Sequence, residues 1–171
     1  LMPQCEAEAR GLSNLMHPAD ERPQTLRFGA APMFDLTGSA NELRSAVSNL
    51  TNNAVRYTPG GGLIEVQWQR LPDGGARLVV TDSGPGIAPQ HLPRLGERFY
   101  RVDRSRSRES GGTGLGLAIT KHVAQRHGGE LQIRSELGHG STFALEFPPQ
   151  RVRAASTAAL VPGSVAPNAE A

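Results

Sequence analysis

The sequence has no long run of apolar residues. No stretch comes near the roughly 18 consecutive apolar residues that a membrane-spanning helix needs, so we expect no direct membrane contact by this part of the protein. Cysteine is nearly missing too: Cys5 is alone, which excludes an internal disulfide framework and fits a reducing compartment. The first ten residues lack the pattern of a signal peptide. We therefore expect a cytoplasmic domain, and the start on Leu1 indicates a piece of a longer protein.

A large excess of charge of one sign is missing as well. The chain has 18 Lys and Arg against 16 Asp and Glu, and a net charge of +2 is too small to indicate a nucleic-acid partner. Residues 94–108 are basic only locally, and this run is either a solvated loop or a site for anions. With 37% hydrophobic and 20% charged residues, the composition is that of one globular domain with additional ends.

The two ends of the chain differ from the middle. Residues 1–22 contain a short helical pattern followed by a His-Pro pair, and we interpret them as the end of an upstream helix and a linker. After a Pro-Pro pair near the other end, the composition shifts to Ala, Ser, Pro and Val, which predicts a disordered tail for residues 150–171. The expected domain is therefore residues 23–149.

Apolar residues at strand or helix spacing predict the secondary structure of this domain. Strand patterns occupy residues 24–30, 33–36, 63–71, 76–81, 131–133 and 143–147. Helical spacing occupies residues 39–58 and 115–127, and a short helix is predicted over residues 89–95. Two histidines in the later helix, His122 and His127, are five residues apart, so we expect them at the surface and not as a metal pair.

The helix over residues 39–58 carries polar residues beside its apolar face. Ser39 followed by Glu42 forms a capping box that starts this helix. At about 100° per residue, Asn49, Asn53 and Arg56 fall on one stripe. Asparagine is mildly unfavourable inside a helix. The stripe is therefore either a solvated flank or a site where an asparagine oxygen ligates Mg²⁺ and the arginine meets phosphate.

An Asp-x-Gly-x-Gly turn follows the strand over residues 76–81. It consists of Asp82, Gly84 and Gly86, with the apolar Ile87 next. An aspartate fixed at a strand end, beside a backbone that bears glycines, lets a flat ligand approach closely. A plain Asx-turn explains Asp82 and one glycine, but it leaves the second glycine and Ile87 without a role.

Residues 87–112 have little regular structure, and we interpret them as a lid with Phe99 as its apolar anchor. The lid leads into four glycines within six residues, which are Gly111, Gly112, Gly114 and Gly116. Uncovered backbone N–H groups at a helix N-terminus can seat phosphate, although an ordinary loop explains them as well. No strand precedes these glycines and no Gly-Lys-Ser/Thr follows them, which argues against the dinucleotide fingerprint and excludes the P-loop.

Five of these segments form a series between residues 24 and 148. They read SNLTNNAVRYTP, DSGPGIA, ERFYRVD, GGTGLGLAI and GHGSTF. The series resembles the catalytic ATP-binding domain of two-component sensor histidine kinases, within the fold shared with gyrase, Hsp90 and MutL. The resemblance implies an α+β two-layer sandwich of the Bergerat (GHKL) type, with a mixed, mainly antiparallel sheet packed on about three helices, and an ATP lid. Residues 43–59 and 93–116 are most similar to phosphate-regulon sensor kinases.

The resemblance also implies roles for individual residues. Asn53 would ligate Mg²⁺ and Asn49 would support the metal and phosphate site, while Arg101 and Arg106 would reach the γ-phosphate of ATP. Asp82 would accept a hydrogen bond from the adenine amino group, with help from Thr142. The remaining nucleotide contacts would be Arg56, Tyr57, Gly84, Gly86, Ile87, Phe99, Tyr100, Gly112, Thr113, Gly114, Leu115 and Gly116.

One position separates the branches of this superfamily. Members that hydrolyse ATP carry a water-activating glutamate four residues before the metal asparagine, where this chain has Asn49. The resemblance then implies transfer of the phosphate to a histidine. None of the five histidines here has the expected His-Glu-x-x-Pro setting, so the acceptor is expected upstream of Leu1, and this chain alone should bind ATP but scarcely turn it over.

The implied partners follow from the same resemblance. They are an upstream dimerisation domain that bears the acceptor histidine and a response regulator, with no nucleic acid. The full-length protein would be a homodimer anchored in the bacterial inner membrane. Two alternatives remain open: a stand-alone serine kinase or ATPase of the same fold, and a nucleotide-sensing module without phosphotransfer.

Overall fold

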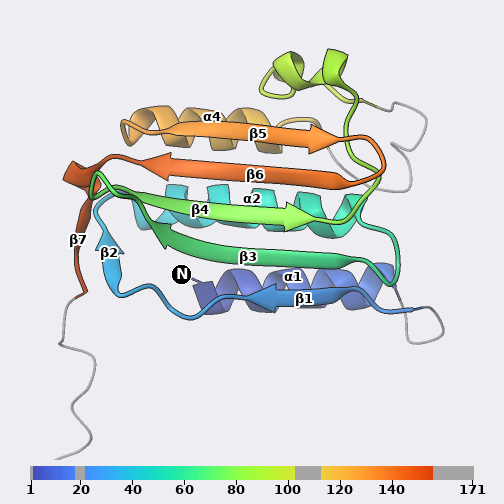
Figure 1. The fold of residues 1–171 in the computed structure, drawn as a ribbon, viewed down its shortest axis with the longest axis horizontal. Helices are drawn as coiled ribbons and strands as arrows, with labels where there is room; N and C mark the ends of the chain where they lie inside the picture. The colour runs from blue at the N-terminus through green and yellow to red at the C-terminus, as the bar shows by residue number, and fades with distance from the viewer. Residues whose placement is uncertain (1, 18–21, 103–112, 156–171) are drawn as a thin grey trace, which may run out of the picture.

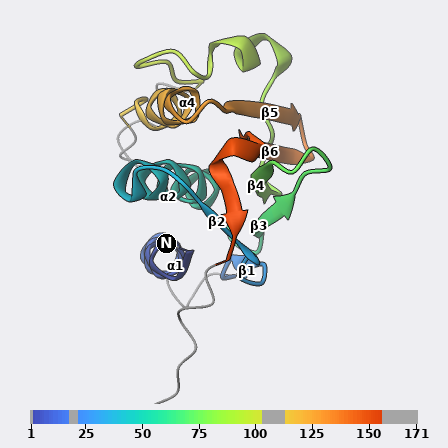
Figure 2. The same cartoon turned by 90° about the vertical axis from the view of Figure 1, so that its left-hand side faces the viewer.

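A five-stranded sheet carries three helices on one of its faces (Figure 1; Figure 2). The computed structural model describes residues 2–17, 22–102 and 113–155. The helices are α1 (Met2–Met16), α2 (Ala40–Tyr57) and α4 (Gly116–Arg126). The strands, in their order across the sheet, are β1 (Thr25–Phe28), β3 (Leu63–Arg70), β4 (Ala76–Asp82), β6 (Gly140–Phe147) and β5 (Glu130–Glu136).

The pairing of the strands is mixed and mainly antiparallel. Only β1 and β3 are parallel, and each of the other pairs in the sheet is antiparallel. The two-layer α+β fold predicted from the sequence is therefore confirmed, with three helices against one sheet. Figure 2 shows the two layers edge-on, with α1, α2 and α4 side by side on the same face of the sheet.

Helix α2 lies at the centre of the helical layer, and its sequence explains why it begins where it does. The hydroxyl of Ser39 accepts the N–H of Glu42 at 3.4 Å, which is the cap that the sequence predicts. Leu43, Val47 and Leu50 are at most 5% exposed, because their helical spacing turns them all toward the sheet. From the sheet, Ile64, Val66, Leu78, Val80 and Leu145 meet this face.

Helix α1 lies within residues 1–22, for which the sequence predicts the end of an upstream helix and a linker. It packs along α2, and Cys5 and Ala9 are fully buried in the common core. At its end the hydroxyl of Ser13 donates to the side-chain oxygen of Gln24 at 2.9 Å, and the amide of Gln24 donates in turn to the carbonyl of Val55 at 2.8 Å. The core of the domain therefore includes residues before the predicted boundary at residue 23.

His127 is another difference, because it is buried and not at the surface, whereas His122 is exposed as expected. Its Nδ1 donates to the carbonyl of Val123 at 2.8 Å, and its Nε2 accepts the N–H of Ser39 at 3.2 Å. One donor and one acceptor satisfy a neutral imidazole completely. His127 thus ties the end of α4 to the start of α2.

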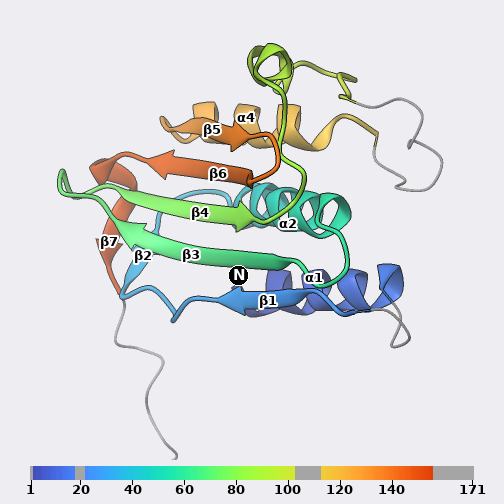
Figure 3. The ribbon, with the colours of Figure 1, turned by 45° about the vertical axis from the view of Figure 1, so that its right-hand side comes forward.

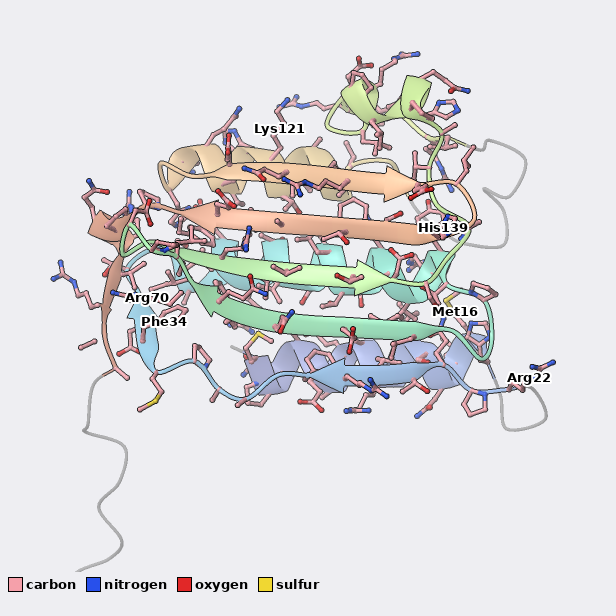
Figure 4. All side chains as sticks on the ribbon, viewed as in Figure 1. Met16, Arg22, Phe34, Arg70, Lys121 and His139 are labelled. Carbon is pink, nitrogen blue, oxygen red and sulfur yellow. The ribbon has the colours of Figure 1, made fainter. Side chains whose placement is uncertain are left out.

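A short ribbon closes the end of the sandwich that is opposite the Asp82 turn. It pairs β2 (Phe34–Leu36) with β7 (Val152–Ala154), which follows the 3-10 helix η2 (Pro149–Arg151). The ribbon packs on β3 through the edge-to-face contact of Phe34 with Trp68, and the Arg70 guanidinium lies over the Phe34 ring (Figure 4). The disordered tail predicted from residue 150 is therefore ordered through residue 154, and residues 156–171 lie outside the described residues.

The lid region begins with a 3-10 helix, η1 (Pro89–Arg94), where the sequence predicts a short helix. Figures 1 and 3 both show η1 beyond the β5 edge of the sheet, and η1 contacts β5. None of the helices in the described ranges combines the length and apolar character that crossing a bilayer demands.

Candidate functional site

The polar stripe of α2 lies at the seam between α2 and α4. The side-chain amide of Asn49 donates to the carbonyl of Gly116 at 3.2 Å, which places Asn49 against the first residue of α4. Asn53 and Arg56 follow on the same stripe by helical spacing, and all three residues are half-buried. The structure therefore places Asn49 of the α2 stripe at the N-terminus of α4.

Asparagine oxygens are hard donors of the kind that Mg²⁺ prefers. Across the described residues, no group of three or more His, Cys, Asp or Glu side chains could hold a metal ion. A site built on Asn53 would thus supply one protein oxygen and leave the other positions to phosphate and water, which is how Mg²⁺ is commonly held with nucleotides. The residues present fit that kind of metal site.

Asp82 ends β4 as a buried carboxylate, 6% exposed. Its Oδ1 accepts the N–H of Gly84 at 2.8 Å. Burial raises the pKa of Asp82, and backbone hydrogen bonds from Gly84 and Ser141 offset only part of this effect. A buried carboxylate with spare lone pairs is a strong acceptor for an N–H group of a ligand.

The glycines of this turn serve the packing of the protein itself. A side chain at Gly84 would come within 2.9 Å of the carbonyl of Tyr57, at the end of α2. Gly86 has φ +72, and a side chain there would overlap the carbonyl oxygen of Glu136. Contacts inside the fold therefore account for both glycines, whatever ligand approaches the turn.

The register of the sheet corrects the expected helper of Asp82. Thr142 pairs with Thr81, and their hydroxyls are 3.4 Å apart on the face of the sheet that points away from the helices. Ser141 is directly opposite Asp82 and therefore shares its face. Ser141 is 7% exposed, and its hydroxyl bonds to that of Ser135 at 2.9 Å. Strict alternation along β6, counted from the buried Phe143, is the sequence signal that could have selected Ser141.

Two cavities flank the end of β4. One of about 430 Å³ lies between the ends of α1 and α2, and its lining includes Arg56, Tyr57 and Gly84 together with Met16, which is labelled in Figure 4. The other, of about 340 Å³, includes Asp82, Ser141 and Thr142 in its lining. Neither cavity reaches Asn49 or Asn53.

Ile87 packs against the core, and its N–H donates to the Ser135 hydroxyl at 2.8 Å.

Phe99 is not the apolar anchor that the sequence predicts. Its ring is 70% exposed, and it is the one non-glycine residue with a positive φ (+63) in the described part of the chain. The buried apolar side chain of this segment is Leu95, at 7% exposure. The N–H of Phe99 donates to the carbonyl of Gly114 at 3.0 Å, so a backbone hydrogen bond joins the middle of the lid to the segment just before α4.

The remaining predicted site residues of the lid and of the start of α4 fall into three groups. Arg101 is half-buried, and its stem lies beside Gly114 (φ +71). Thr113 is exposed, while Leu115 and Gly116 are half-buried at the start of α4. Arg106 and Gly112 lie outside the described residues.

Tyr100 contacts η1 through a pair of residues that sequence reasoning missed. Its hydroxyl is hydrogen-bonded to Nδ1 of His91, and the Arg94 guanidinium lies over its ring. A histidine and an arginine in a short loop helix have no distinctive sequence signal.

Comparisons with known proteins find relatives over most of the chain. The profile of the family described as Histidine kinase-, DNA gyrase B-, and HSP90-like ATPase matches residues 38–151. The phosphate regulon sensor protein PhoR of Pseudomonas aeruginosa is 54% identical over 131 residues, which are 77% of this chain and 29% of that protein. The sensor-like histidine kinase SenX3 of Mycolicibacterium smegmatis is 42% identical over 130 residues, which are 76% of this chain and 34% of that protein. The chain thus spans roughly a third of the length of these relatives.

Solved structures with the same fold include sensor histidine kinases. The mycobacterial sensor histidine kinase MprB superposes with a TM-score of 0.70 at 29% identity, over 90% of this chain and 96% of that chain. The full-length ShkA structure in complex with AMPPNP gives 0.68 at 30% identity, over 89% of this chain and 31% of that chain.

Proposed function

Since the chain belongs to the histidine kinase-, DNA gyrase B- and HSP90-like ATPase family, as the catalytic domain of a sensor kinase, we propose that it holds Mg-ATP and donates the γ-phosphate to a histidine. That histidine would lie in an upstream dimerisation domain of the same homodimeric kinase. A response regulator aspartate would then receive the phosphate. The similarity to PhoR makes phosphate starvation the proposed stimulus. A cytoplasmic location of this domain and an anchor in the inner membrane belong to the same proposal.

The presence of Asn49 is the observation that favours transfer of the phosphate over hydrolysis of ATP. ATP-hydrolysing members of the superfamily have a glutamate at this position to activate water, and an amide cannot accept a proton from water at neutral pH. The amide of Asn49 is also engaged, because it donates to the carbonyl of Gly116. The site thus offers no carboxylate base on the α2 stripe, and the phosphate is kept for another acceptor.

We propose the following roles for the residues of the site. Asn53 would ligate Mg²⁺ while Arg56 and Arg101 meet the phosphates, with the backbone at Gly114 and Gly116 beside them. Asp82 would accept a hydrogen bond from the adenine amino group, with Ser141 as its neighbour. These tasks are charge neutralisation and positioning, which make up most of what phosphoryl transfer requires of a protein.

Asn53→Ala and Asn52→Ala form a matched pair that tests this function. The two asparagines are adjacent on α2, and only Asn53 lies on the stripe with Asn49. Wild type and Asn52→Ala should bind ATP tightly only with Mg²⁺, release little phosphate alone, and label a histidine-bearing helical hairpin supplied in trans. Asn53→Ala should bind ATP equally in Mg²⁺ and in EDTA and leave the hairpin unlabelled. Calorimetry and transfer from γ-labelled ATP measure these outcomes.

Other results would point elsewhere. Rapid phosphate release without the hairpin would favour an ATPase of the same fold. Tight Mg²⁺-dependent binding with no transfer to any histidine would favour a nucleotide-sensing module. If Asn53→Ala kept the full Mg²⁺ dependence, the metal assignment would be wrong.

A further inference from the structure

Three side chains join η1 to the chain just before Arg101. The Nδ1 of His91 and the hydroxyl of Tyr100 are hydrogen-bonded at 2.5 Å. The guanidinium carbon of Arg94 lies 4.2 Å from the centroid of the Tyr100 ring, and Glu97 holds Arg94 in place through an ion pair of 3.1 Å. We call His91, Arg94 and Tyr100 the Tyr100 clamp. In this clamp, His91 contacts the hydroxyl of Tyr100 and Arg94 contacts one face of its ring.

The residue before the clamp has a strained backbone. Phe99 adopts φ +63, which costs free energy for an L-residue with a bulky side chain. Its ring is 70% exposed, so burial of apolar surface does not offset this cost. Phe99 is held from both sides instead: its N–H donates to Gly114, and Tyr100 follows in the clamp. Strain of this kind persists where the surroundings fix it, and it concentrates at functional sites.

Arg101 is the residue whose direction this arrangement sets. It follows Tyr100 directly, and its Cγ would lie 3.2 Å from a side chain placed at Gly114. The stem of Arg101 is therefore held two residues before α4, beside the helix N-terminus where the proposed function expects phosphate.

The position of η1 does not depend on the clamp. Leu95 is 7% exposed at the end of η1, and Gly96 packs so closely on α4 that a side chain there would come within 2.8 Å of Cδ of Lys121 (labelled in Figure 4). The buried Leu95, the Lys121 side chain and the contacts of η1 with β5 already attach η1 to the body of the domain. The clamp adds the orientation of Tyr100, and with it the backbone that leads into Arg101.

We propose that His91 and Arg94 are positioning residues which, through Tyr100, aim Arg101 at the γ-phosphate and so make the site prefer ATP over ADP. This inference rests on the proposed function. His91 and Arg94 act through Tyr100, since His91 engages its hydroxyl and Arg94 covers one face of its ring.

The test compares the affinities of Mg-ATP and Mg-ADP by calorimetry. Wild type should prefer ATP. His91→Ala and Tyr100→Phe should each weaken ATP binding about three- to tenfold, the range of one neutral hydrogen bond, while ADP affinity stays within about twofold. The double variant should lose no more than either single variant, because both remove the same bond. His91→Asn, which keeps a polar group near the hydroxyl, should restore part of the preference, and the exposed His122→Ala is the control.

The outcomes separate this inference from the proposed function. A wild type that binds neither nucleotide overturns both. A wild type that binds ATP and ADP equally, or clamp variants that keep the full preference, overturns the clamp alone. Equal losses for ATP and ADP would show a merely structural role. If His91→Ala does not fold, Tyr100→Phe gives the same measurement, because it removes only a hydroxyl.

Discussion

At Asp82 the folded chain buries a carboxylate that two backbone N–H groups stabilise. Burial outweighs those bonds and raises the pKa of Asp82, so the ionised form is less favourable in the folded protein than in the unfolded chain. A carboxyl of this kind contributes stability at low pH, and this contribution is lost as the pH rises through its folded-state pKa. Above that pKa, the ionised Asp82 costs stability and is available to a ligand as a hydrogen-bond acceptor.

Asp82→Asn should separate these two effects. At pH 7 we expect a higher melting temperature than wild type, with a difference that shrinks as the pH falls and the wild-type carboxyl is protonated. Preference for ATP over GTP should fall by about 1.5–3 kcal/mol, as expected for a hydrogen bond to a charged group. Asp73→Asn is the control, because the exposed Asp73 makes the same bond to Gly75 at 2.8 Å. A destabilised Asp82→Asn at pH 7 would show that the carboxylate stabilises the folded protein at that pH.

Ser141 and Thr142 are neighbours on opposite faces of β6. Ser141→Ala should lower ATP affinity about three- to tenfold, because the hydroxyl beside Asp82 is lost. Thr142→Val keeps the shape of its side chain and should leave the affinity unchanged. Nucleotide titrations of the two variants at one pH decide between them. The reverse pattern would restore Thr142 as the partner of Asp82.

At the scale of elements, α1 is joined to α2 by more than apolar contact. Gln24 follows α1 in the chain and is 8% exposed. It accepts the Ser13 hydroxyl and donates to the carbonyls of Val55 and Thr58, two groups at the end of α2 that have no partner inside the helix. The side-chain amide of Gln24 thus donates to the free carbonyls at the C-terminal end of α2 and links the end of α1 to that end.

Gln24→Ala should lower the free energy of unfolding by about 2–4 kcal/mol, because it leaves several buried polar groups unpaired. Denaturant unfolding measures this loss, and Gln4→Ala on the exposed side of α1 should change stability by less than about 0.5 kcal/mol. Equal values for the two variants would show that water replaces Gln24 without cost.

At the scale of the whole molecule, the sequence predicted the features that depend on residues close together in the chain. The start of α2 follows from Ser39 and its apolar period, and the Asp82 turn follows from its own residues. The sequence could not predict what depends on distant partners. The faces of Ser141 and Thr142 depend on the register with β4, the burial of His127 depends on the start of α2, and Phe99 takes its conformation from Gly114.

Gly86 and Gly140 both allow close contacts between backbone segments at the Asp82 turn. A side chain at Gly86 would overlap the carbonyl oxygen of Glu136, and one at Gly140 would overlap the carbonyl oxygen of Asp82. Backbone meets backbone on both sides, so variation in side chains cannot adjust the distance between these strands. In the lid, by contrast, side-chain contacts such as that of His91 with Tyr100 add to the backbone bond of Phe99 with Gly114. We therefore expect substitutions at Gly86 and Gly140 to be tolerated less well than substitutions on the exposed surface of the lid.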